Sequence, residues 1–138
     1  MGFKRFREYR RSEGGALVHT QFYGNAWEEF VELQSQPKEV YVANVIEYLQ
    51  SLNRVEIYGY MHGSPIGGAV LTTEIDYHVG KCVSVVTQYV LPRYRDTGVS
   101  FEIMRRARKE CKAQGVGMLA WSHRVRDFEY KTVYRRVG

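Results

Sequence analysis

Residues 92–100 read PRYRDTGVS and stand between a segment typical of a β-strand and a segment typical of an α-helix. The preceding residues, KCVSVVTQYVL at 81–91, are rich in β-branched side chains, and apolar residues from 99 to 113 recur at helical spacing. We therefore expect a strand-to-helix junction with Gly98 at the start of the helix. A helix N-terminus presents unpaired N–H groups and the positive end of the helix dipole, so this junction can bind phosphate.

The segments around this junction alternate between strand and helix signals. The order β-α-α-β-β-β-α-β-α predicts one α/β domain over residues 1–138, with a mixed sheet that has an antiparallel half and a β-α-β half. The expected elements are a strand at 2–10, a helix capped by Asn25, a helix opened by Pro37, strands at 55–63, 64–80 and 81–92, a helix at 99–113 ended by Gly115, a strand at 116–122 and a helix from about Asp127.

Composition sets further limits on the function. A chain of 138 residues with 44% hydrophobic residues can build one core. The chain has no apolar stretch long enough to span a membrane and no apolar run after its basic N-terminus, so we expect a soluble, cytoplasmic protein. Cys82 and Cys111 lack metal-type spacing, which predicts reduced, packed thiols. The net charge of +5 favours anionic partners, among them coenzyme A phosphates, nucleic acid and acidic protein surfaces.

The junction resembles the acyl-CoA binding motif of the GNAT N-acetyltransferases, Q/R-x-x-G-x-G/A, often extended as Pro-x-Tyr-Arg-Gly-x-Gly-Ile-Gly. PRYRDTGVS follows this pattern with two departures, Asp96 in place of a frequent glycine and Ser100 in place of glycine or alanine. Ile103 and Met104 stand where the family has two leucine-like residues. The hairpin IYGYMHGSPIGGAVL also resembles the family, so the likeness covers roughly residues 54–137. The motif is partly eroded, and a short chain of this kind is also similar to phage-encoded GNAT-like proteins.

The resemblance implies a GNAT fold, with C-terminal strands shortened or absent because the chain stops at Gly138. It also implies acetyl-CoA or CoA as the cofactor, without a metal, and acyl transfer to an amine by direct attack. The backbone from about Arg95 to Ser100 would then hold the pyrophosphate, and the end of the preceding strand would pair with the pantetheine arm. The positions implicated in cofactor binding are Val90, Leu91, Arg93, Arg95, Asp96, Thr97, Gly98, Val99, Ser100 and Asp127.

Two proton transfers need their own residues. Tyr134 occupies the place of a tyrosine that, in the family, protonates the departing thiolate of CoA, so the resemblance makes it the candidate general acid. The family often carries a basic glutamate on the central strand, but no glutamate lies between Cys82 and Pro92. The remaining candidates for the base are Glu74, Asp76, His78 and His123.

The acceptor stays open at this point, as an amine-bearing small molecule or a protein. Asp96, the missing glutamate and the short C-terminus leave a second hypothesis, a GNAT-like protein that has lost catalysis. Such a protein would bind a protein or nucleic acid, or form part of a phage virion. Nucleic acid is the less favoured partner, because the basic residues of the 99–113 helix are typical of a solvated face. A homodimer could complete the acceptor groove. The four histidines show no ligand spacing, and we expect no metal.

Overall fold

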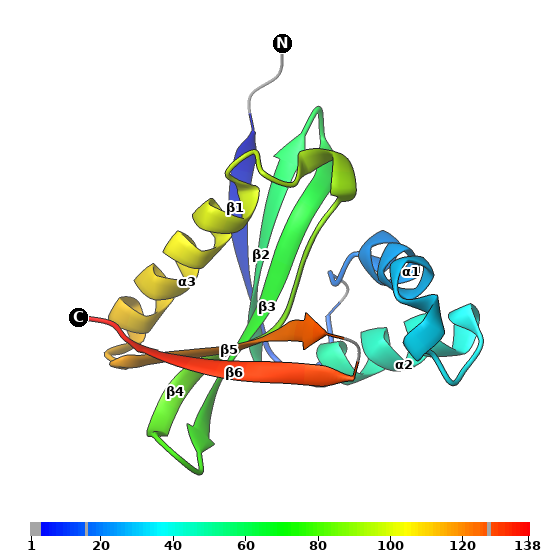
Figure 1. Ribbon diagram of the computed structural model, residues 1–138. Helices are drawn as coiled ribbons and strands as arrows, with labels where there is room; N and C mark the ends of the chain where they lie inside the picture. Colours follow the sequence, from blue (N-terminus) through cyan, green and yellow to red (C-terminus); the bar gives the residue numbers. More distant parts are fainter. Residues whose placement is uncertain (1–3, 16, 127) are drawn as a thin grey trace.

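The computed structural model describes residues 4–15, 17–126 and 128–138. Its strands form one six-stranded sheet, and its helices pack against that sheet (Figure 1). The strands are β1 (Arg5–Arg11), β2 (Arg54–Met61), β3 (Ser64–Asp76), β4 (Gly80–Val90), β5 (Met118–Arg126) and β6 (Glu129–Arg136). The helices are α1 (Thr20–Glu29), η1 (Val31–Leu33), α2 (Lys38–Gln50), η2 (Pro92–Tyr94) and α3 (Val99–Gln114). No described helix is long and apolar enough to cross a membrane.

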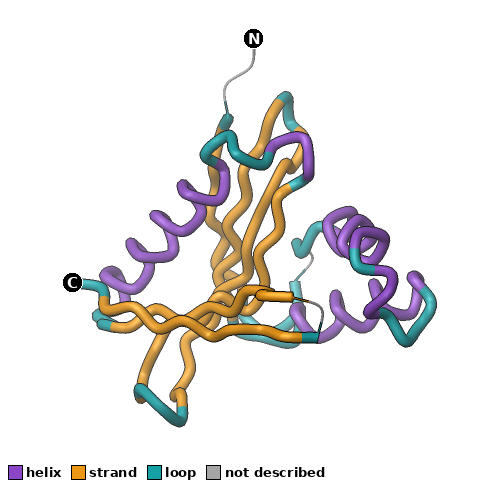
Figure 2. The backbone as a smooth tube through the Cα atoms, viewed as in Figure 1, coloured by secondary structure: helices purple, strands orange, loops and turns teal. Residues whose placement is uncertain are grey.

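The strands lie in the sheet in their order along the chain, β1-β2-β3-β4-β5-β6. Neighbouring strands are antiparallel except β4 and β5, which are parallel and are connected by α3. A parallel pair needs such a crossover connection, because a tight turn cannot return the chain to the same end of the sheet. The predicted mixed α/β fold is therefore confirmed from β1 to β5 (Figure 2).

The C-terminal segment is a strand, and the helix expected from about Asp127 is wrong. β6 pairs antiparallel with β5 from Met118↔Arg136 to Arg126↔Glu129, so a further C-terminal strand is present. Tyr130, Tyr134 and Val137 fit helical spacing, but EYKTVYRR is also rich in aromatic and β-branched residues. Pairing with the open edge of β5 satisfies the backbone groups of this segment, and it therefore forms a strand and not a helix. Asp127 itself lies outside the described residues.

Helix α1 begins earlier than the sequence indicated. Its N-cap is His19, and Asn25, the expected cap, lies inside the helix. The extra N-terminal turn contributes Phe22 and Tyr23, which are 2% and 7% exposed. Burial of these aromatic rings outweighs the local preference of asparagine for a cap position.

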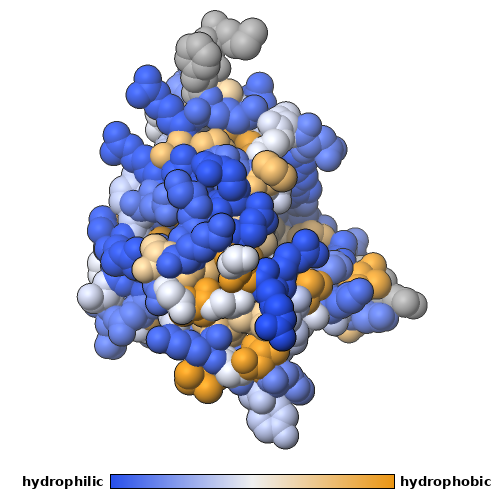
Figure 3. All heavy atoms as spheres, turned by 90° about the vertical axis from the view of Figure 1, so that its left-hand side faces the viewer, coloured by the Kyte–Doolittle hydropathy of each residue, from blue (hydrophilic) through white to orange (hydrophobic). Residues whose placement is uncertain are grey.

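Two apolar clusters hold helices to the two faces of the sheet. One joins α3 to the sheet through Ile103, Ala107, Ile57, Leu71, Val83 and Leu119. The other lies on the opposite face and joins α1 and α2 to the sheet through Val18, Phe22, Tyr23, Leu49, Tyr58 and Val70. Cys82 and Cys111 are free and buried, which confirms the expected packed thiols. Figure 3 views the molecule from the side of α3 and shows a mostly hydrophilic outer surface there.

A buried ion pair lies under α1 and α2. Arg54 Nε donates to Glu56 Oε2 over 2.6 Å, and both side chains are 0% exposed. Glu56 Oε1 also accepts hydrogen bonds from the Val18 amide and the Tyr58 hydroxyl. Arg54 Nη1 donates to the carbonyls of Gln50 and Leu52. This network ties the start of β2 to the segment before α1 and to the connection between α2 and β2.

The ion pairs of α3 predict an acid-sensitive contribution to stability. Hydrogen bonds from Arg105 and Arg106 lower the pKa of Glu102 to about 2, against a usual value of 4.5. A carboxyl group with a lowered pKa stabilises the fold above its usual pKa and loses that contribution as the pH falls through the folded value. Replacing Glu102 by glutamine should therefore cost about 1 kcal/mol or less near neutral pH. Urea unfolding should show the difference shrink between pH 4.5 and about 2, and a pH-independent difference would contradict this assignment.

Candidate functional site

The turn before α3 has an open arrangement of backbone amides. Asp96 and Gly98 both have left-handed backbone conformations, with φ of 62° and 87°. The first helical hydrogen bond runs from the Glu102 amide to the Gly98 carbonyl over 3.0 Å. The amides of Val99, Ser100 and Phe101 precede it, so the helix itself leaves them without an acceptor. These three N–H groups and the positive end of a 16-residue helix face the turn.

The position of Gly98 in front of these amides is open. Gly98 is the N-cap of α3 and makes no side-chain capping hydrogen bond, because it has no side chain. A Cβ placed on Gly98 would meet no heavy atom within 4 Å. Glycine at this position leaves room for an anion near the backbone, and phosphate binding here stays a prediction.

The neighbouring strands form a second opening. β4 and β5 pair only at Val83↔Leu119, Ser84↔Ala120 and Val85↔Trp121. Beyond this point β4 continues to Val90 while β5 turns away from it, so the two strands diverge (Figure 1). A register shift in the β3–β4 ladder lies beside the divergence, where Val70 pairs with Thr87 and Leu71 with Val85. We call the space between the diverging strands the splay.

Backbone groups of β4 point into the splay at alternate residues. The Leu91 amide donates to the Ile66 carbonyl over 2.9 Å, and the Leu91 carbonyl accepts from the Tyr94 amide. In an antiparallel ladder the next pair, Gly67 and Val90, turns its backbone groups away from the partner strand. Val90, and Gln88 two residues earlier, therefore face the splay. Leu91, which was expected to pair with the pantetheine arm, has both of its backbone groups occupied.

Arg95 is placed at the turn but is held by the protein. Its Nη1 and Nη2 donate to the two carboxylate oxygens of Glu29, each over 2.9 Å, and its Nε donates to the Val90 carbonyl over 3.0 Å. The guanidinium also lies 5.2 Å from the centre of the Tyr89 ring. Arg95 thus forms an ion pair with α1 in this structure, and the expected contact between Arg95 and phosphate stays a prediction. Sequence analysis missed Glu29, which lies 66 residues away.

Other charged groups near the turn have mixed signs. Lys4 Nζ donates to the Thr97 carbonyl over 3.1 Å, which brings a cation that the sequence analysis did not single out. Arg93 is exposed, with its guanidinium 5.3 Å from the Tyr94 ring centre. Asp96 is exposed and does not cap α3. Ser100 accepts a 2.7 Å hydrogen bond from the Gln88 side chain, which ties the first turn of α3 to β4.

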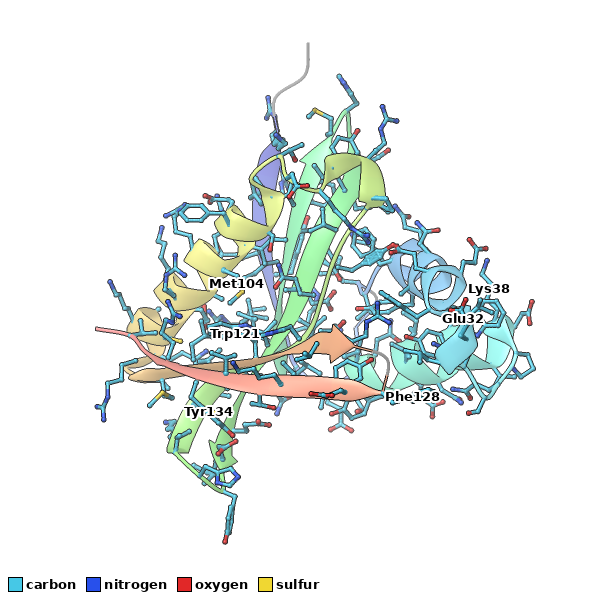
Figure 4. All side chains as sticks on the ribbon, in the orientation of Figure 1. Glu32, Lys38, Met104, Trp121, Phe128 and Tyr134 are labelled. Atoms are coloured by element: carbon cyan, nitrogen blue, oxygen red, sulfur yellow. The ribbon has the colours of Figure 1, made fainter. Side chains whose placement is uncertain are left out.

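The Tyr134 hydroxyl lies toward the other end of β4, beside Asp76, while its backbone is level with Ser84. Tyr134 sits on β6 opposite Ala120, and its hydroxyl donates to Asp76 Oδ2 over 3.1 Å, beside the β3–β4 turn (Figure 4). Asp76 pairs with Gly80 at the start of β4, whereas Val90 ends this strand. At about 3.3 Å per residue the two ends of β4 are roughly 30 Å apart. The structure therefore does not bring Tyr134 together with the turn.

The same end of β4 holds the one group of three metal-type ligands found among the described residues. Glu74, Asp76 and Cys82 have ligand atoms within 4.8 Å of one another. However, Asp76 already accepts hydrogen bonds from the His78 and Val79 amides and from Tyr134. These bonds lower the pKa of Asp76, the His78 amide contributing most. The carboxylate is thus part of a turn motif.

A different tyrosine lies at the splay. Tyr23 of α1 is 7% exposed, and its hydroxyl lies close enough to Thr87, the first β4 residue after the register shift, for the Thr87 side chain to affect its pKa. Burial raises the pKa of Tyr23, so its hydroxyl keeps its proton at neutral pH. The sequence analysis did not single out Tyr23, because its position near Thr87 depends on how α1 packs.

A comparison with family models matches residues 20–138 to the acetyltransferase (GNAT) family. The chain belongs to the GNAT acetyltransferase family. The match covers most of the chain and includes both the turn before α3 and the splay, so the resemblance drawn from PRYRDTGVS is confirmed. The mixed sheet with its three α-helices is accordingly a GNAT fold.

Solved GNAT structures share this fold at low sequence identity. The aminoglycoside N-acetyltransferase AAC(6')-Iy in complex with CoA superposes with a TM-score of 0.59 at 18% identity, covering 91% of this chain and 80% of that one. A putative GNAT acetyltransferase from Desulfovibrio desulfuricans has a TM-score of 0.60 at 11% identity, covering 88% and 73%. An aminoglycoside 6'-N-acetyltransferase from Acinetobacter baumannii has a TM-score of 0.59 at 12% identity, covering 89% and 81%. The comparison with curated protein sequences gives no match.

Proposed function

We propose that this GNAT protein transfers an acyl group, in the simplest case acetyl, from CoA to an amine. The observation that carries the proposal is the meeting of two backbone openings, the free first turn of α3 and the splay beside β4. The first turn of α3 suits the diphosphate of CoA, and the splay suits its extended pantetheine arm. CoA is bound in the structure of the related aminoglycoside N-acetyltransferase, which supports the same use of the fold here.

Backbone groups do most of the binding in this proposal. The amides of Val99, Ser100 and Phe101 donate to the diphosphate, with Gly98 allowing close approach. The Val90 amide and the backbone of Gln88 hydrogen-bond the pantetheine arm along the edge of β4. Because these donors belong to the backbone, Asp96 and Ser100 alter the motif without removing a donor. Asp127 and Leu91 are not included, the first being undescribed and the second having its backbone groups occupied.

Acyl transfer requires a polarised carbonyl and a proton for the departing sulfur. A bound thioester supplies an electrophilic carbonyl, and a backbone amide of β4 in the splay can donate a hydrogen bond to its oxygen. The Tyr23 hydroxyl can donate to the sulfur as it leaves, because it is protonated and lies beside Thr87. Tyr23 thus takes the role that the resemblance gave to Tyr134.

The acceptor amine must lose a proton before or during attack. Glu74, Asp76 and His78 lie at or beside the β3–β4 turn, at the wrong end of β4. His123 lies on β5 beyond Trp121, the last residue paired with β4, and so borders the splay. Of the four candidate bases, His123 is the one we retain.

The negative charge of α1, η1 and α2 suits a cationic amine as the acceptor. Residues 20–50 carry one lysine against five glutamates, a net charge of −4 in a chain whose net charge is +5. These residues form α1, η1 and α2, which lie across the sheet from α3. An ammonium group is attracted to this side, and the anionic cofactor to the rest of the molecule. We therefore propose a cationic, amine-bearing small molecule or peptide as the acceptor.

Calorimetric titration with acetyl-CoA tests the proposal directly. We expect saturable binding at micromolar to millimolar ligand, followed by release of the free CoA thiol when amines are added. The absence of binding heat at millimolar acetyl-CoA would overturn cofactor binding. Binding without thiol release across a panel of polyamines, aminoglycosides and basic peptides would favour the non-catalytic alternative instead.

A further inference from the structure

Three elements meet at the carboxylate of Glu29, the last residue of α1. The carboxylate accepts two hydrogen bonds from Arg95 in the turn and one from the Tyr89 hydroxyl of β4. The Tyr89 ring stacks on Phe22 of α1, with 5.9 Å between ring centres and 6° between ring planes. Arg95 therefore packs on a ring that also contacts α1. The contact links the helix on one face of the sheet to the turn before α3.

Arg95 in turn determines where the turn lies relative to β4. Its Nε donates to the Val90 carbonyl, one of the backbone groups that face the splay. With two further bonds to Glu29, three of the five N–H donors of the guanidinium have protein acceptors. The bidentate geometry fixes the plane of the guanidinium as well as its position. Arg95 is thus oriented by its partners in the ligand-free protein.

Glu29 remains ionised in this setting. Burial alone would raise the pKa of Glu29, but the hydrogen bonds from Arg95 and Tyr89 outweigh it and lower the pKa. The side chains of Glu29 and Arg95 are 25% and 44% exposed, so water partly screens the pair. An ion pair of this exposure contributes little to global stability. Its effect is expected to be local, on the geometry of the turn.

We propose that Glu29 is a positioning residue for acyl-CoA binding, which orients Arg95 against the end of β4 and so holds residues 92–98 in their open conformation. The proposal rests on the proposed function, since it concerns the same cofactor. It differs from the role expected from the motif, in which Arg95 itself contacts the phosphates. In that case Glu29 would compete with phosphate for the guanidinium.

The two roles predict opposite effects of one substitution. If Glu29 positions the turn, Glu29→Gln should weaken acetyl-CoA binding about fivefold to tenfold. Arg95→Gln should weaken it to a similar extent, and the double variant should be no weaker than either single one, because both act through one contact. If Arg95 is a phosphate ligand restrained by Glu29, Glu29→Gln should tighten binding while Arg95→Gln weakens it.

The experiment combines calorimetric titration of acetyl-CoA with hydrogen exchange of the Tyr94 and Arg95 amides, which are bonded to the Leu91 and Pro92 carbonyls in the turn of the ligand-free protein. We expect faster exchange of these amides for Glu29→Gln, with the melting temperature of the whole protein changed by only a few degrees. Glu28→Gln is the matched control, because Glu28 is the preceding residue of α1 and its ion pair with Lys38 lies outside the site. It should change neither binding nor exchange.

The outcomes separate this inference from the proposed function. Unchanged exchange in Glu29→Gln overturns the positioning role, whether or not the wild-type protein binds acetyl-CoA. Tighter binding in Glu29→Gln overturns it in favour of a direct phosphate contact. A wild-type protein that binds no acetyl-CoA overturns the proposed function, and the role of Glu29 in cofactor binding with it, even if Glu29→Gln loosens the turn.

Discussion

Replacing Gly98 by valine is expected to lower the affinity for acetyl-CoA at least about a hundredfold. The position is open in the ligand-free protein, because a Cβ at Gly98 would have no heavy atom within 4 Å, so the substitution creates no clash by itself. The new side chain would instead occupy the space in front of the α3 amides, where the diphosphate is proposed to bind. Loss of two charge-assisted hydrogen bonds at about 1.5 kcal/mol each gives a factor of this size.

Gly63→Val separates binding from backbone strain. Gly98 and Gly63 have φ of 87° and 78°, and valine at either position suffers similar strain, about 1–2 kcal/mol. Gly63 lies in the β2–β3 turn and also has no heavy atom within 4 Å of its Cβ position. Both variants should lose similar stability in urea unfolding, and calorimetry should show weakened binding in Gly98→Val alone. Equal affinities in the two variants would show that the amides of α3 do not hold the phosphates.

Replacing Glu56 by glutamine is expected to produce the largest loss of stability, about 3–5 kcal/mol. Glu56 and Arg54 are fully buried, so the substitution leaves the Arg54 guanidinium without a counter-charge in the interior. It also changes the Glu56 carboxylate that accepts hydrogen bonds from the Val18 amide and the Tyr58 hydroxyl. Domains of this kind are stable by about 5–15 kcal/mol, so a large share of the total would be lost.

Urea unfolding and thermal melting measure this loss. Glu28→Gln again provides the comparison, because the Glu28 side chain is 58% exposed and its ion pair should contribute less than about 1 kcal/mol. A loss below about 1 kcal/mol for Glu56→Gln would mean that water or a shift of the neighbouring loop compensates Arg54. It would also remove the argument that this network ties β2 to the loops around it.

The two substitutions act on separate properties of the protein. Glu56 lies between the sheet and the helices α1 and α2, whereas Gly98 lies on the surface at the end of β4. The fold around Glu56 can be weakened without altering the turn, and the turn can be blocked without altering the core. The contact between α1 and the turn is the ion pair of Glu29, which ends α1, with Arg95.

The sequence alone was sufficient for the junction and for most of the order of elements. Residues 92–100 lie where a strand of β-branched residues gives way to a periodic helix, and Gly98 does begin that helix. These signals are local, since helix periodicity, glycine conformations and strand composition act within a few residues of one another. The match of the junction to the GNAT motif rests on the same local residues.

Only the tertiary structure decided the C-terminal strand and the partners at the site. Tyr130, Tyr134 and Val137 fit a helix, and the open edge of β5 makes their segment a strand. That pairing directs the Tyr134 hydroxyl to Asp76 beside the β3–β4 turn, and the packing of α1 brings Tyr23 close to Thr87 and Glu29 to Arg95. Such contacts join residues far apart in the chain, and they depend on which strand edges and helix faces remain unpaired after the local elements have formed.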